Sequence, residues 1–72
     1  MDRDEWLAEF CRRIGVEPPS PEEIDELLQL AATAAHGSER PAAPLACWAA
    51  GRSGRSAADL NQTAMDVSPA NP

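Results

Sequence analysis

The side chains best suited to chemistry in this chain are those of His36 and Arg40, which lie four residues apart. The loop that contains Arg40 leads into a predicted helix, whose first N–H groups have no partner within the helix and attract anions. Together these groups would bind a phosphate or carboxylate, as a nucleotide carries. The alternative is structural: His36 satisfies the last carbonyls of the preceding helix, and Arg40 pairs with Glu39 or a helix carboxylate.

The chain lacks the combination of side chains that catalysis or metal binding needs. His36 is the only histidine, and no nucleophile is evidently placed to exchange a proton with it. A zinc site normally takes four ligands, and this chain has two cysteines and one histidine. We therefore expect no enzyme activity, no metal and no cofactor. Cys11 and Cys47 are expected to be buried, inert thiols, with a redox disulfide between their two helices as the alternative.

The negative charge of the chain argues against nucleic acids and anionic membranes as partners. The 72 residues carry a formal charge of −6, with a pI near 4.5. Nucleic-acid phosphates and anionic membrane surfaces both attract lysine and arginine, so neither is expected as a partner. No stretch approaches the roughly 18 apolar residues of a membrane span, and the acidic start MDRDEW does not resemble a secretory signal. These features favour a single cytoplasmic domain.

The first half of the chain predicts two helices. Apolar residues at helical spacing from Trp6 to Ile14 predict a helix over 4–14, which Gly15 ends. A second helix is expected from a Ser20 cap to Gly37, because Ser20 and Glu23 form a capping-box pattern. Its expected buried face comprises Ile24, Leu27, Leu28, Ala31, Ala34 and Ala35.

The second half predicts two shorter helices. The third starts at Pro41 or at Pro44, and the steric conflict of an interior proline favours the later start. We expect Leu45, Trp48 and Ala49 to form its apolar face and Gly51 to end it. Ser56 and Asp59 suggest a second capping box, opening a fourth helix to about residue 66 that buries Ala57, Leu60, Ala64 and, at its end, Val67.

This pattern indicates an all-α protein, a small bundle of three to four short helices. No segment alternates with a period of two, so no strand is expected. Residues 1–66 form the predicted domain, and 67–72 a disordered tail. The alanines in the second half of the second helix leave space that Trp6 or Trp48 is expected to fill as a core residue. The alternative places a tryptophan such as Trp48 at the surface, as an anchor for a partner.

Four segments carry a resemblance to a known family. They are Trp6-Leu7, the Pro-Pro-x-Pro-Glu-Glu helix start at 18–23, Ala-His-x-x-Glu-Arg at 35–40 and Ala-Pro-Leu at 43–45. With these segments the chain resembles a small helical domain of high-GC actinobacteria, the domain of unknown function family 6457. That family occurs alone or fused to nucleotidyltransferases similar to the enzyme that attaches guanine nucleotide to molybdopterin.

The resemblance implies an accessory role near molybdenum-cofactor maturation, and it carries over no functional residues. We therefore expect a non-catalytic interaction module whose partner is a molybdopterin guanylyltransferase-like protein. The alternative is a phosphate- or nucleotide-binding domain that uses His36 and Arg40. Trp48 completes the set of candidate ligand- or partner-binding residues.

Overall fold

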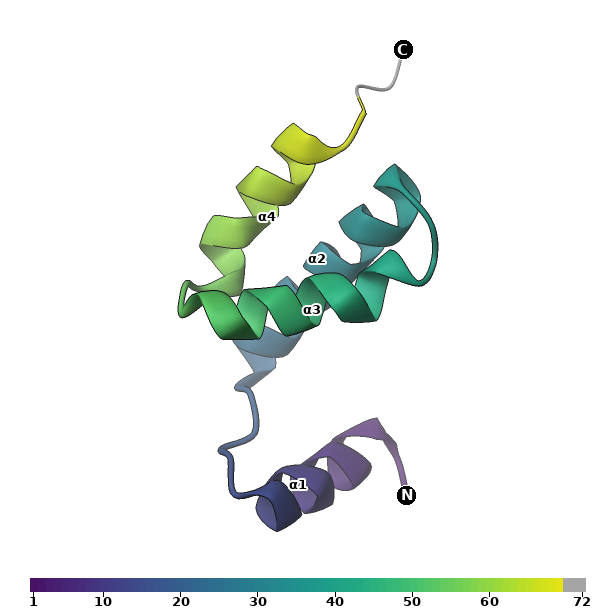
Figure 1. Cartoon of the computed structure of the whole chain (residues 1–72). Helices are drawn as coiled ribbons and strands as arrows, with labels where there is room; N and C mark the ends of the chain where they lie inside the picture. The colour runs from purple at the N-terminus through teal and green to yellow at the C-terminus, as the bar shows by residue number, and fades with distance from the viewer. Residues whose placement is uncertain (70–72) are drawn as a thin grey trace.

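A computed structural model describes residues 1–69, which contain four α-helices and no strand (Figure 1). The helices are α1 (Arg3–Ile14), α2 (Pro21–Gly37), α3 (Ala42–Ser53) and α4 (Ala57–Val67). The prediction of a small all-α fold is therefore confirmed. Within this part of the chain, no helix is both long and apolar enough to cross a membrane.

Side-chain caps define where α1 and α2 begin. Asp2 accepts a hydrogen bond from the Glu5 amide, and the Glu5 carboxylate accepts one from the Asp2 amide. This capping box starts α1 one residue before the expected position. The predicted box of Ser20 and Glu23 is confirmed at the start of α2. Gly15 ends α1 in the left-handed region, with φ 77°, as its lack of a side chain allows.

The third helix begins earlier and ends later than expected. Pro41 is the N-cap, and Pro44 lies in the first turn of α3. The favoured start at Pro44 was wrong because a first-turn proline removes only an N–H that has no partner in the helix. The predicted end at Gly51 was also wrong. Gly51 lies inside α3, and Gly54 ends the helix with φ 72°.

The last helix keeps part of its predicted cap. The Ser56 hydroxyl accepts from the Asp59 amide at 3.1 Å, and the reciprocal bond of a full capping box is not among those found in residues 1–69. α4 continues through Val67, one residue past the expected limit of the domain, and Ser68 caps it by donating to the Ala64 carbonyl. The rest of the predicted tail, 70–72, lies outside the described residues.

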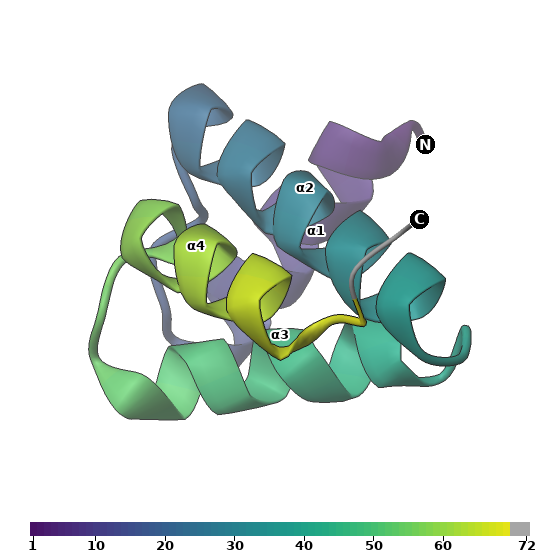
Figure 2. The ribbon, with the colours of Figure 1, turned by 90° about the horizontal axis from the view of Figure 1, so that it is seen from above.

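Helix α2 is the centre of the molecule. Both α3 and α4 pack against α2 far more extensively than against each other, whereas α1 lies apart, connected by an extended segment (Figures 1 and 2). The most buried side chains in the described part of the chain are those of Cys11, Leu30, Ala50 and Asn61. The core is therefore small, and one of its four members is polar.

The two tryptophans do not fill the core. Trp6 is 54% exposed and stacks on Phe10, with 5.0 Å between ring centroids, and Trp48 is 66% exposed. The predicted core role of these rings is wrong, because α3 packs through alanine. Ala50 is buried, and Leu45 and Trp48 lie on the opposite side of that helix. The predicted apolar face of α3 is therefore its exposed face. Leu28 of α2 is likewise exposed, and Leu30 is buried in its place.

Candidate functional site

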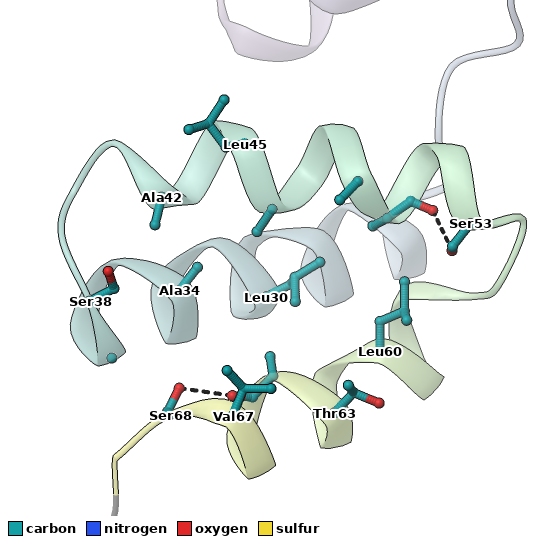
Figure 3. A pocket seen from close by; sticks show the side chains of 15 residues that line it. Leu30, Ala34, Ser38, Ala42, Leu45, Ser53, Leu60, Thr63, Val67 and Ser68 are labelled. Carbon is teal, nitrogen blue, oxygen red and sulfur yellow. Dashed lines mark hydrogen bonds between the residues drawn. The ribbon is translucent and has the colours of Figure 1, made fainter.

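An open apolar groove of about 660 Å³ runs between α3 and α4, with α2 as its base (Figure 3). We call it the α3–α4 groove. Its lining includes Leu30 and Ala34 of α2, Ala42, Leu45 and Ala49 of α3, and Leu60, Ala64 and Val67 of α4. No charged side chain lines it.

Small side chains create the groove. Helices α3 and α4 each pack on α2 and hardly contact each other. Only their own side chains can therefore fill the space between them. The α3 wall consists mainly of alanines, such as Ala46, and the α4 wall contributes one alanine, Ala64. The alanines in the second half of α2 were a correct signal for free space. The expectation that a tryptophan of the same chain would fill this space was the error.

Two of the four hydroxyl side chains that line the groove donate to carbonyls of their own helices. The Ser53 hydroxyl donates to the Ala50 carbonyl at 2.7 Å, and the Ser68 hydroxyl donates to the Ala64 carbonyl at 2.8 Å (Figure 3). Their donor hydrogens are therefore already used. Recognition in the groove must depend on shape and apolar contact, since few polar groups are available to fix the orientation of a polar ligand.

Gly37 and Ser68 close one end of the groove. A Cβ added to Gly37 would lie 2.8 Å from the Ser68 Cβ, closer than real Cβ contacts allow. Gly37 is the last residue of α2, as predicted, and its φ is not positive. The absence of a side chain there permits the close approach of the end of α4.

Asn61 ties α4 to α2, and sequence reasoning missed it. Its side chain is 8% exposed. The Nδ2 group donates to the Glu26 carbonyl of α2 at 3.0 Å and to the Ala57 carbonyl of α4 at 2.9 Å. The Oδ1 atom is buried without a hydrogen-bond partner. A polar residue within an otherwise apolar α4 stripe was the available signal, because buried amides usually make specific hydrogen bonds.

Trp48 does not line the groove, but it is exposed on the same helix, α3. It follows Leu45 by three residues, so the two side chains are neighbours on α3, and Leu45 lines the groove. The Arg52 guanidinium lies over the Trp48 ring, 5.5 Å from its centroid. The ring is therefore held in place and exposed, as an anchor for a partner requires.

His36 and Arg40 do not share a cavity in residues 1–69. His36 is exposed and borders a hollow of about 300 Å³ with Gln29, Thr33 and Pro69, and Arg40 is not among the residues that line it. The Ala42 amide donates to Glu39 at 2.9 Å, so the first N–H of α3 is already bonded within the loop. Arg40 takes part in none of the ion pairs found in residues 1–69, so its predicted pairing with Glu39 or a helix carboxylate is not observed either.

The cysteines are free thiols. Cys11 is buried and Cys47 is half-buried. Burial raises the pKa of the Cys47 thiol above its usual 9.0, so this side chain is protonated at neutral pH and is a poor nucleophile. No group of three or more possible metal ligands occurs in the part of the chain that the structure describes.

Four short helices with an open, uncharged groove define a small all-α domain. The chain belongs to the family described as a domain of unknown function (DUF6457), whose match covers residues 1–70. The match extends past the four segments that carried the resemblance and includes all of α4. No curated protein and no solved structure matches the chain.

Proposed function

We propose that this chain is a non-catalytic interaction module that binds a partner protein through the α3–α4 groove and Trp48. The observation that carries the proposal is the exposure of large apolar side chains around the groove. Leu45 is 67% exposed and Val67 is 79% exposed, and both line the groove. Contiguous apolar surface of this kind marks a site of protein association.

The chemistry of the groove supports binding over catalysis. Its lining contains no titratable side chain. The hydroxyls of Ser53 and Ser68 donate to carbonyls of their own helices. General acid–base or nucleophilic chemistry needs a proton-transfer group beside the reacting atoms. An exposed tryptophan that is the helix neighbour of a groove-lining leucine is instead typical of an interface anchor.

The partner in this proposal is a molybdopterin guanylyltransferase-like protein. The support for this choice is the family membership together with the association that the family resemblance implies. The role is accessory: the module would dock on the nucleotidyltransferase or hold it near other components of molybdenum-cofactor maturation. The groove supplies the contact surface, and the acidic charge of the chain favours a basic surface on the partner.

The test is a titration of the isotope-labelled chain with such a nucleotidyltransferase, followed by amide NMR. We expect shifts or broadening at residues that line the groove, with a dissociation constant in the micromolar range or tighter. Ala49→Trp would place a large side chain in the groove and abolish binding. Ala58→Trp is the matched control, because Ala58 is exposed on α4 and does not line the groove. Binding that survives Ala49→Trp would reject the groove as the site, and no binding would reject the partner.

A further inference from the structure

The dimensions of the α3–α4 groove match those of a short helix. Its α3 wall spans Ala42 to Ser53, and 12 helical residues extend about 18 Å. A partner helix of about three turns would therefore lie along the whole groove. The alanines of the α3 wall leave room for large apolar side chains from the partner, since a small wall residue admits a large facing one.

The openness of the groove argues for a helix over a small apolar ligand. Sites for small ligands bury most of the ligand surface, whereas Leu45 and Val67 of this lining are themselves mostly exposed. A ligand such as a fatty acyl chain would stay largely in water here. A helix covers both walls at once and buries the exposed side chains together with its own apolar face.

Charge along α4 indicates which helix would fit. Thr63 lines the groove, and Asp59 and Asp66 are its neighbours four residues before and three residues after it on the helix surface. Both aspartates are exposed. The three ion pairs found in residues 1–69 all lie within α1, and the Gln62 amide that donates to Asp66 is neutral. Beside the groove-lining Thr63, α4 therefore carries two exposed aspartates that have no ion-pair partner in residues 1–69.

We propose that the groove binds an amphipathic helix of a partner protein, with large apolar side chains on one face and two basic side chains seven residues apart beside it. The basic side chains face Asp59 and Asp66, which are also seven residues apart. This inference rests on the proposed function and specifies the chemistry of the partner. A second copy of the chain is a poorer occupant, because it carries the same charge of −6.

Two fluorescein-labelled 14-residue helical peptides test the inference. Both carry the same leucine face; one has two arginines at a seven-residue spacing beside it, and the other has two glutamates there. We expect fluorescence anisotropy to show binding of the arginine peptide at least about tenfold tighter than that of the glutamate peptide at low salt. The difference should shrink as salt screens the exposed charges.

Charge variants of the chain provide the decisive control. Asp59→Lys with Asp66→Lys should invert the preference between the peptides, and Asp59→Asn with Asp66→Asn should abolish it. Glu17→Lys with Glu22→Lys changes the net charge equally, away from the groove lining, and should leave the preference intact. Circular dichroism checks that each variant is folded. Ala49→Trp should abolish binding of the arginine peptide.

Three outcomes would overturn the inference. One is absence of binding or equal binding of the two peptides, another is binding that Ala49→Trp leaves unchanged, and the third is sedimentation that shows self-association blocked by Ala49→Trp. If the peptides fail but the nucleotidyltransferase binds at the groove, the helix inference fails and the proposed function stands. If the peptides succeed and the nucleotidyltransferase does not bind, only the proposed partner is wrong.

Discussion

At the scale of single residues, two side chains determine how α4 sits on α2. Asn61 bonds the Glu26 carbonyl from within the interface, and Gly37 lets Ser68 approach the end of α2. Neither residue is large or apolar, so neither is marked by hydrophobic periodicity. Their importance follows from what surrounds them, because a buried amide must find partners and two backbones can approach closely only where a side chain is missing.

Replacing Asn61 by aspartate should destabilise the protein and make its stability depend on pH. The new carboxylate would be buried and would face the carbonyl oxygens that now accept from Nδ2. At neutral pH we expect a loss of at least about 2 kcal/mol in the free energy of unfolding. Burial raises the folded-state pKa of such a group above its unfolded value.

The sign of the pH effect follows from that raised pKa. The protonated acid is tolerated, so stability is greatest below the unfolded pKa near 3.9 and falls as the pH rises through the folded pKa. Urea denaturation of Asn61→Asp between pH 3.5 and 7.5 measures this trend, with Asn61→Ala as the control that lacks a titratable group. If the difference in the free energy of unfolding between Asn61→Asp and Asn61→Ala does not change with pH, residue 61 is solvated.

Gly37→Ala should destabilise the chain, although alanine favours a helix. The added Cβ would collide with Ser68, and overpacking of this kind costs about 1–3 kcal/mol. In a Ser68→Gly background the collision is removed, and the same substitution should stabilise by about 0.5–1 kcal/mol. Thermal unfolding of the four proteins gives the comparison. Equal effects of Gly37→Ala in both backgrounds would contradict the close approach.

At the scale of helices, α3 shows how packing selects one face over another. Its sequence offers a large apolar face with Leu45 and Trp48 and a small one with Ala46 and Ala50. The small face packs against α2 because alanine allows a close helix approach, and the large face stays exposed beside the groove. Side-chain size thus decided which face of α3 packs on α2, and Ala46 and Ala50 of that face also line the groove together with Leu45.

Trp48→Ala should leave the fold intact and weaken partner binding. The exposed ring contributes its stacking with Arg52, so the free energy of unfolding should change by about 1 kcal/mol or less. Leu30→Ala provides the contrast: this residue is 4% exposed, and its truncation should cost about 2–5 kcal/mol. Urea denaturation compares the two. A large loss of stability in Trp48→Ala would show that the ring is buried in the core.

The stability of α1 should decrease in acid because of Glu9. The Glu9 carboxylate accepts from Arg12 at 2.6 Å and from Arg13 at 2.7 Å. These hydrogen bonds, that of Arg12 foremost, hold the pKa of Glu9 below its usual 4.5. A lowered pKa means that the stabilisation is present above the unfolded pKa and is lost as the pH falls through the folded pKa.

Amide shifts of α1 followed from pH 6 to pH 2.5 measure this dependence. The wild-type chain should lose helical amide shifts in α1 below about pH 4.5. Glu9→Gln should show reduced helical shifts in α1 already at neutral pH, and these shifts should not change further through a titration of residue 9. Glu22→Gln is a matched control on α2, since Glu22 makes none of the ion pairs found in residues 1–69. Identical titrations of α1 in wild type and Glu9→Gln would refute the role of the ion pair.

At the scale of the whole molecule, the packing divides unevenly along the chain. Helices α2, α3 and α4 form the packed unit, and in α1 only Cys11 is buried, with Leu7 and Glu9 half-buried. Trp6 and Phe10 of α1 stack on each other and are both largely exposed. The groove is a property of the α2–α4 unit alone, so α1 is not needed to form the candidate site.

A chain shortened to residues 17–72 should therefore remain folded. We expect the amide spectrum of α2–α4 to be retained, with a loss of about 1–3 kcal/mol from the apolar surface that α1 covers. Groove-directed binding of a partner should persist in this shortened chain. Collapse of the amide dispersion would show instead that Cys11 and Leu7 belong to an indispensable core.

The sequence by itself determined the helices and most of their ends, because caps such as Ser20 and Glu23 and left-handed glycines such as Gly15 act through neighbouring residues. It also determined the all-α class and the family. The tertiary structure alone decided which face of α3 is buried, that α1 stays apart and that a groove stays open. Those outcomes depend on how closely two helices approach. That distance is set by side chains that are far apart in the sequence, such as Asn61 and Glu26 or Gly37 and Ser68.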